Sequence, residues 1–185
     1  MNHNHGGPTA DVSVRVAWAD DAESIADVQV RAWPELYAGL LPAELLPTDV
    51  KAVAAQWRQA LARPADARNR VLVALERNRV VGFALTSPAV DPDCDPVADG
   101  ELAEVTLDPR ERAKGHGSRL LQAAVDTLAA DRFTRAVTWV NAGDDALRTF
   151  LTDAGWAADT AHRELDLDGT GTTTVKQVRL HTAIG

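Results

Sequence analysis

Seven stretches of the chain have the hydrophobic pattern of β-strands. Each is apolar throughout or alternates between apolar and polar residues, and turn-forming residues bound it. One strand ends before Pro109, because proline cannot donate to a strand ladder. The expected strands are residues 12–16, 71–76, 80–86, 102–107, 137–140, 158–167 and 174–181.

Four further stretches have apolar residues at helical spacing. In the first, Asp20 and Asp21 can cap the helix, and Pro34 ends or kinks it. The second closes at Pro64, and Gly155 ends the last. The apolar faces are Ile25, Val28, Ala32 and Trp33; Val50, Val53, Ala54, Trp57 and Leu61; Leu120, Leu121, Ala124, Val125 and Leu128 beyond Gly117; and Ala146, Leu147, Phe150 and Leu151 after Asp144.

The order of these elements predicts a mixed α/β (α+β) fold, with a central sheet of about seven strands flanked by helices. A chain of 185 residues, 45% of them hydrophobic, suits a single domain with a proper core. We expect that domain to span residues 11–185. Residues 1–10 are polar and are expected to form a flexible tail.

Composition narrows the classes of function. The net charge of −8 argues against a nucleic acid partner and is compatible with cationic amine substrates. No apolar run is long enough to cross a membrane, and the start lacks the apolar core of a signal peptide, so we expect a cytoplasmic protein. The single cysteine, Cys94, lies between two aspartates, which disfavours a thiolate nucleophile.

We expect no metal site. His3 and His5 lie in the polar tail and are interpreted as solvated. The segment 87–100 carries four aspartates but lacks the register of a calcium loop, so it is interpreted as a solvated loop.

Between the fourth strand and the third helix lies a glycine-containing loop, Arg112-Ala113-Lys114-Gly115-His116-Gly117. Glycines at a helix start let a ligand approach the backbone closely, and the free N–H groups there favour an anion. Basic side chains add positive charge: Arg110, Arg112, Lys114 and Arg119. The loop therefore predicts a phosphate or pyrophosphate site, although neither a P-loop nor a Rossmann fingerprint is present.

The string VTLDPRERAKGHGSRLL resembles the acetyl-CoA-binding segment of the bacterial GNAT N-acetyltransferase superfamily, with Arg112, Gly115 and Gly117 at its three signature positions. The segment RAWPELYAGLLP is similar to the corresponding segment of one bacterial branch of this superfamily. A second family signature is matched with two departures, since Asp144 replaces the usual Asn and Leu151 the usual Tyr. The matching residues are Trp139-Val140, Asp144, Phe150-Leu151 and Gly155-Trp156.

This resemblance implies a set of site residues. The backbone of Val105 and Leu107 is expected to bind pantetheine, and the Val105 N–H to polarise the acetyl carbonyl. Asp144 and Leu151 are expected beside the cofactor. The loop residues expected to bind coenzyme A are Arg112, Ala113, Lys114, Gly115, His116, Gly117 and Ser118.

A carboxylate is the expected general base, because few amine molecules are deprotonated at neutral pH. The resemblance favours Glu101, and Glu104 is the alternative. Strand alternation is expected to put Glu101 and Val105 on one face and Glu104 on the other. The only tyrosine, Tyr37, is the candidate general acid or a wall of the acceptor pocket.

The resemblance thus implies an acetyl-CoA-dependent N-acetyltransferase that acts directly on a primary amine of a small molecule, a protein N-terminus or a lysine. A GNAT-fold module that binds acyl-CoA as a sensor is the alternative, because of the departures at Asp144 and Leu151. Assembly into a homodimer is left open.

Overall fold

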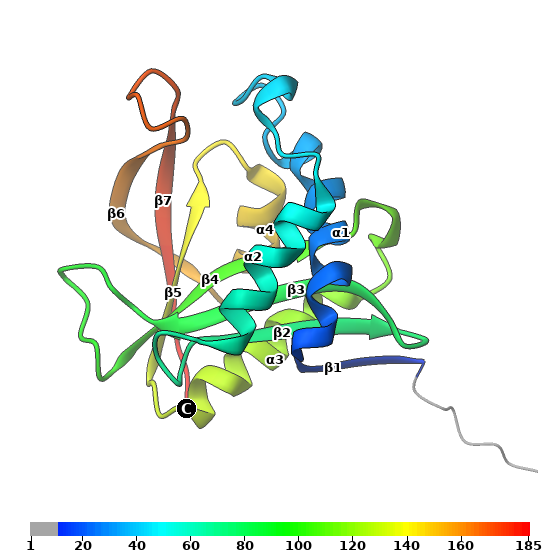
Figure 1. Cartoon of the computed structure of the whole chain (residues 1–185). Coiled ribbons are helices and arrows are strands. Elements are labelled where there is room, and N and C mark those ends of the chain that lie inside the picture. The colour runs from blue at the N-terminus through cyan, green and yellow to red at the C-terminus, as the bar shows by residue number, and fades with distance from the viewer. Residues whose placement is uncertain (1–10) are drawn as a thin grey trace, which may run out of the picture.

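A seven-stranded sheet forms the centre of the computed structural model, which describes residues 11–185 (Figure 1). Its strand order is β1-β2-β3-β4-β5-β7-β6, and every pair is antiparallel except β4 and β5. The strands are β1 Val12–Val16, β2 Arg70–Glu76, β3 Arg79–Pro88, β4 Asp99–Leu107, β5 Arg135–Asn141, β6 Ala157–Asp166 and β7 Thr174–Ala183.

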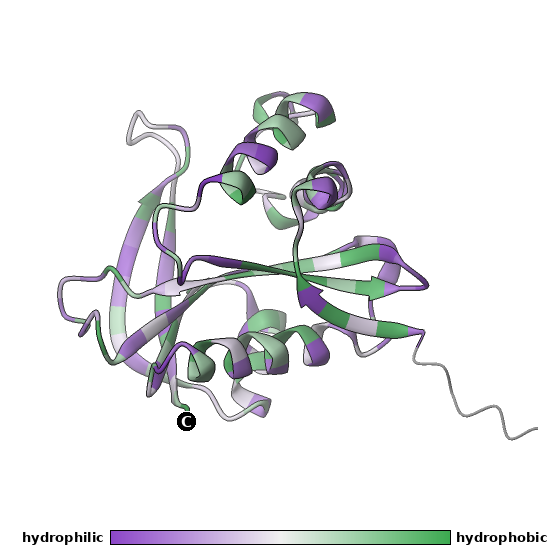
Figure 2. Cartoon of the chain, turned by 60° about the horizontal axis from the view of Figure 1, so that its bottom comes forward, coloured by the Kyte–Doolittle hydropathy of each residue, from purple (hydrophilic) through white to green (hydrophobic). Residues whose placement is uncertain are grey.

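Helices cover both faces of the sheet, and Figure 2 shows one helical layer on each side. Helices α1 (Ala22–Leu36) and α2 (Val50–Ala62) pack on one face, where Ile25 and Val28 meet Phe83. Helices α3 (His116–Ala130) and α4 (Asp145–Asp153) contribute Leu120 and Leu151 to the larger core on the other face. The predicted order of strands and helices is confirmed.

Several predicted details were wrong. Helix α1 continues through Pro34 to Leu36, so the first of the two predicted outcomes, that Pro34 ends the helix, is wrong. Asp21 does not cap α1 with its side chain. Its carboxylate instead accepts from Arg15, at 2.7 Å, and from the Trp18 N–H.

The acidic loop after β3 was predicted to be solvated, and this holds only in part: the Asp93 side chain is 64% exposed, but that of Asp91 is 15% exposed. Arg179 of β7 is 4% exposed, and its guanidinium donates to Asp91 and Asp93 at 2.6 to 3.0 Å and to Asp159 at 2.6 Å. A buried guanidinium needs such acceptors, so the loop is held against the sheet.

Gly82 lies where β3 meets β4 most closely. A Cβ atom there would lie 2.7 Å from Leu107 Cδ2 and 2.9 Å from the Thr106 carbonyl oxygen. The sequence interpretation, a bulge or a close backbone approach, is confirmed, since the β2–β3 register also shifts next to Gly82.

Asp108 joins the end of β4 to helix α1. Its side chain is fully buried and accepts from Arg31, at 2.8 Å, and from Arg110, at 3.1 Å. Burial alone would raise the pKa of Asp108, but the hydrogen bonds from Arg110 and Arg31 outweigh it and lower the pKa to about 2.

Asp108→Ala is expected to lower the free energy of unfolding by about 3 kcal/mol, the scale for breaking a buried ion pair. Because the folded-state pKa lies below the unfolded value, the carboxylate stabilises the fold above about pH 4, and this contribution is lost as pH falls toward 2. Urea unfolding at pH 7 and pH 3 measures both effects. The exposed Asp20→Ala is the control, and an Asp108 variant as stable as that control would contradict the assignment.

No helix among residues 11–185 is long and apolar enough to cross a membrane. Residues 1–10, the predicted tail with His3 and His5, lie outside the described part of the chain.

Candidate active site

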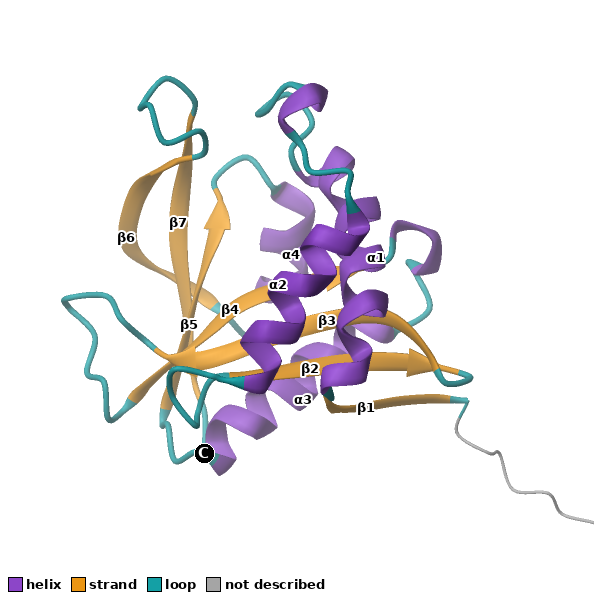
Figure 3. Ribbon diagram, viewed as in Figure 1, coloured by secondary structure: helices purple, strands orange, loops and turns teal. Residues whose placement is uncertain are grey.

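The two parallel strands β4 and β5 begin as neighbours and then separate (Figure 3). They pair only from Asp99 to Glu101 and from Arg135 to Val137. The apex of the opening is fixed by Thr138, whose hydroxyl donates to the Leu102 carbonyl oxygen at 2.7 Å. Beyond this bond, one edge of β4 has no strand partner among residues 11–185.

The free edge of β4 presents the backbone of Val105 and Leu107 to the gap. The Asp108 N–H donates to the Val81 carbonyl at 2.8 Å, so the backbone polar groups of Asp108 point toward β3. These groups alternate in direction along a strand, so those of Leu107 and Val105 point away from β3. The backbone amides of an extended ligand could therefore pair there, as a further strand would.

At the far end of β4, the glycine loop leads into helix α3. Gly115 precedes the helix with φ +81°, a conformation that favours glycine. An added Cβ on Gly117 would lie 3.4 Å from Leu107 and 3.6 Å from Phe150, which are ordinary contact distances, so the loop lies close to β4 and α4 but packing there does not require a glycine. The N–H groups of the first turn of α3 are free to bind an anion.

The basic residues around this loop are mostly paired, contrary to the sequence interpretation that they add their charge to the anion site. Arg112 pairs with Glu35 at 2.5 Å, Lys114 with Glu111 at 2.7 Å, and Arg110 with Asp108. Arg119 donates instead to the Lys114 carbonyl oxygen. Anion binding therefore depends on the backbone N–H groups and on Arg119 more than the sequence suggested.

The His116 side chain is 2% exposed and points into the protein. Its Nε2 lies 3.5 Å from Glu76 Oε2, and neither atom has a hydrogen-bond partner among the described residues. Only the backbone of His116 is therefore available to a ligand at the loop.

A cavity of about 280 Å³, here called the transfer cavity, opens between the separated strands. Helix α1 supplies Trp33 at one side, Tyr37 follows that helix, and α4 supplies Leu151. The full lining is Gln29, Trp33, Leu36, Tyr37, Leu102, Ala103, Glu104, Val105, Thr106, Thr138, Trp139, Val140, Asn141, Asp144, Leu147, Phe150, Leu151, Leu165, Leu167, Val175 and Gln177.

A bulge in β4 puts both candidate bases on the same face of the sheet. Glu104 pairs with Leu85 and Glu101 with Ser87, two residues apart on β3, so Ala103 is an extra residue in β4. Val105 packs with the core beneath α3, on the opposite face. The prediction that Glu101 and Val105 share a face, with Glu104 opposite, was therefore wrong, because strict alternation fails at a bulge.

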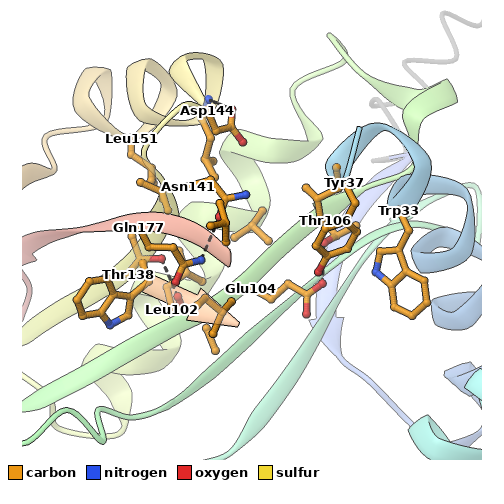
Figure 4. A pocket seen from close by; sticks show the side chains of 18 of the residues that line it. Trp33, Tyr37, Leu102, Glu104, Thr106, Thr138, Asn141, Asp144, Leu151 and Gln177 are labelled. Atoms are coloured by element: carbon orange, nitrogen blue, oxygen red, sulfur yellow. Dashed lines mark hydrogen bonds between the residues drawn. The ribbon is translucent and has the colours of Figure 1, made fainter. Parts of the chain in front are cut away.

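Glu104 lies in the transfer cavity, and Figure 4 shows it on the same side as Tyr37, Thr106 and Trp33. The Thr106 hydroxyl donates to Glu104 Oε1 at 2.9 Å. Burial raises the pKa of Glu104, and the Thr106 hydrogen bond only partly offsets it. A carboxylate with a raised pKa is a stronger base than an exposed one.

Glu101 lines a second cavity of about 540 Å³, here called the apolar cavity. Burial raises the pKa of Glu101, Asp91 raises it further, and Arg163 and Arg179 act in the opposite direction. The bulge residue Ala103 lines both cavities.

The profile of the acetyltransferase (GNAT) family matches residues 26–156, which include the separated strands and the glycine loop. The chain belongs to the GNAT acetyltransferase family. No curated protein sequence matches the chain.

Solved structures share this GNAT fold. The yncA protein of Salmonella typhimurium, solved with acetyl-CoA, is 16% identical, with a TM-score of 0.68 over 95% of each chain. The PaiA N-acetyltransferase of Thermoplasma acidophilum, in complex with coenzyme A, is 15% identical, with a TM-score of 0.69 over 93% of this chain and 98% of that one. The ribosomal-protein-alanine N-acetyltransferase of Brucella melitensis is 19% identical, with a TM-score of 0.69 over 93% and 99%.

The two departures from the second GNAT signature both line the transfer cavity. The Asp144 carboxylate caps α4 by accepting from the Leu147 N–H at 3.1 Å. Leu151 is 2% exposed and packs in the core, so it cannot donate a proton. The usual GNAT tyrosine therefore has no counterpart at this position, although Tyr37 reaches the same cavity.

Two clusters among the described residues combine side chains that can bind metals, but other contacts occupy both. Glu111, beside Glu76 and His116, is paired with Arg79 and Lys114. The cluster of Asp91, Asp93 and Cys94 surrounds the Arg179 guanidinium. Burial raises the pKa of the Cys94 thiol, as do the aspartates, while Arg179 opposes them.

Sequence reasoning missed several polar residues of the cavity. Thr138 fixes the apex of the gap, and Gln177 Nε2 donates to Asn141 Oδ1 at 3.1 Å in the opposite wall (Figure 4). A threonine within the apolar run of β5 was a usable signal, because a buried hydroxyl needs a partner. Gln177 gave no such signal, since polar residues occur along the whole of β7.

Proposed function

We propose that the protein transfers the acetyl group of acetyl-CoA directly to a primary amine. One observation carries this proposal: the free edge of β4 and the partly buried carboxylate of Glu104 meet in one cavity, with the glycine loop beyond the end of the strand. The GNAT structures with acetyl-CoA and coenzyme A support this choice of donor.

The residues present fit acetyl-CoA along its length. The first turn of α3, from Gly115 to Ser118, suits the pyrophosphate, because its N–H groups face an anion. Pantetheine amides suit the free backbone groups of Val105 and Leu107. The acetyl carbonyl then lies near the Val105 N–H, which stabilises negative charge developing on its oxygen.

We assign the general base to Glu104 in preference to Glu101. Glu104 shares the transfer cavity with Val105, whereas Glu101 lines the neighbouring one. The amine nitrogen attacks the acetyl carbon, the C–N bond forms, and the C–S bond breaks. The proton leaves the nitrogen for Glu104, the departing thiolate takes a proton from water, and Glu104 then gives its proton to the hydroxide that remains, which restores the carboxylate.

We propose no covalent acetyl-enzyme. The pKa of the Cys94 thiol is raised, and Cys94 packs with Ala89 and Val137 outside the transfer cavity. Turnover is therefore expected to persist in Cys94→Ala.

Tyr37→Phe is expected to raise the KM for the acceptor severalfold and to leave kcat within about threefold. Burial raises the pKa of Tyr37, and Glu104 raises it further, so the phenol is a weaker acid than usual. A coenzyme A thiol, with a pKa near 8.5, leaves without such help. Steady-state kinetics separates the two constants. A hundredfold fall in kcat with an unchanged KM would instead identify Tyr37 as the general acid.

The proposal is tested by measuring the release of free coenzyme A with a panel of amines, together with the mass of the product. We expect release that depends on the amine and a product heavier by one acetyl group. Tight binding of acetyl-CoA with no release for any amine would favour the alternative, an acyl-CoA-binding sensor module.

A further inference from the structure

The apolar cavity lies between the C-terminal end of α2 and the sheet. Trp57 and Pro64 form one wall, and Val71 and Leu85, which pair across β2 and β3, form the floor. Pro88 and Val90 close one side, and Val90 is 83% exposed. The volume of about 540 Å³ falls in the range of small-molecule sites.

Glu101 is the one carboxylate in this wall that pairs with no side chain of the described residues. The other acid, Asp66, pairs with Arg68 at 3.1 Å. Arg70 is likewise occupied, by Asp131 at 2.6 Å. Arg63, the remaining charged residue of the wall, is exposed at the end of α2. The wall thus offers a large apolar surface with one partly buried carboxylate that has no side-chain partner among the described residues, which complements an organic cation.

The apolar cavity adjoins the transfer cavity. Ala103 is exposed and lines both, between Glu101 on one side and Glu104 on the other. The walls of the two cavities also touch at Trp57, whose indole N–H donates at 2.7 Å to Gln29 of the transfer cavity. A molecule seated against Trp57 could therefore extend past Ala103 to the backbone of Val105.

We propose that the acceptor is a primary amine carried on an apolar body, with the body in the apolar cavity and the amine passing Glu101 to reach Glu104. This inference rests on the proposed acetyl transfer and names the substrate class. A polyamine or an amino sugar fits less well, because its other polar groups would face Val71, Leu85 and Trp57 without partners.

The test compares acceptors that differ in the body and share the primary amine. Initial rates with hexylamine, phenethylamine, ethylamine and spermidine give kcat/KM for each. We expect hexylamine and phenethylamine to exceed ethylamine and spermidine about tenfold or more, through a lower KM.

Two matched variants of helix α2 test whether the preference for hexylamine over ethylamine arises in the apolar cavity. Ala60 and Ala62 are both exposed residues of α2, but only Ala60 lines the apolar cavity. Ala60→Phe fills the cavity and is expected to reduce the ratio of kcat/KM for hexylamine to that for ethylamine about tenfold. Ala62→Phe is expected to leave this ratio unchanged, and thermal unfolding checks that both variants fold.

The failures of the two proposals are distinguishable. Equal or better rates with ethylamine or spermidine, or an equal effect of both phenylalanine variants, would overturn the apolar acceptor while leaving acetyl transfer intact. Binding of acetyl-CoA by calorimetry with no acetylation of any amine would overturn acetyl transfer, and the acceptor class with it.

Discussion

Glu104→Gln is expected to lower kcat about a hundredfold or more, while acetyl-CoA binding stays within about threefold. Glutamine keeps the shape of the side chain and the contact with the Thr106 hydroxyl, but it cannot accept the proton of the amine. The wild-type rate is expected to rise with pH through the raised pKa of Glu104, because only the deprotonated carboxylate acts as a base. Profiles of kcat between about pH 5 and 9 should lose this acidic limb in the variant.

Glu101→Gln is the matched control, since both carboxylates lie on the same face of β4. It is expected to raise the KM for the amine, through loss of a negative charge beside the acceptor, and to change kcat little. The reverse pattern, with kcat lost in Glu101→Gln and kept in Glu104→Gln, would assign the base to Glu101.

Gly117→Glu is expected to weaken acetyl-CoA binding about a hundredfold, which corresponds to about 2.7 kcal/mol. The new side chain would place bulk and negative charge at the first turn of α3, where the helix dipole and free N–H groups otherwise favour an anion. Calorimetry with acetyl-CoA measures the loss directly. Titration with 3′-dephospho-coenzyme A tests where the effect lies. This ligand keeps the pyrophosphate, so an equal loss of affinity is expected if the pyrophosphate binds at the first turn of α3.

Two controls separate charge from packing. Gly117→Ala adds only a methyl group, 3.4 Å from Leu107, and is expected to bind nearly as well as wild type. Ala130→Glu adds the same charge at the opposite end of α3 and should leave affinity unchanged. Wild-type affinity in Gly117→Glu would show that the pyrophosphate is bound elsewhere.

The order of strands and helices was predictable because each element carries its own periodicity. Alternation marked β1, and the stripe from Leu120 to Leu128 marked α3. Gly155, with φ +97°, also ended α4 as predicted, because that conformation favours glycine. These signals are local, so a single sequence contains them.

The face that each carboxylate occupies was not predictable. It depends on the extra residue Ala103 in β4, and a bulge at an alanine has no local signature such as a glycine. The bulge is defined only by the pairing of β4 with β3, in which Ala103 has no partner residue. One residue of register moved Glu101 from the face of Val105 to the face of Glu104, and so changed the choice of base.

The ion pairs could not be predicted for a similar reason. Arg179 and Asp91 lie 88 positions apart, and Arg112 and Glu35 lie on separate elements. Counting basic residues near the glycine loop therefore overestimated its free positive charge. The backbone geometry of the loop was predictable, because Gly115 and the helix start are encoded together.

The central claim, direct acetyl transfer to an amine, is tested most directly by a single-turnover experiment with labelled acetyl-CoA and enzyme in excess over the donor. With hexylamine present, we predict that the label moves from coenzyme A to the amine nitrogen at the rate at which free thiol appears, that Cys94→Ala behaves identically, and that no label is found on the protein at any time. Label that accumulates on the protein first, or that stays on coenzyme A when amines are added, would contradict the account.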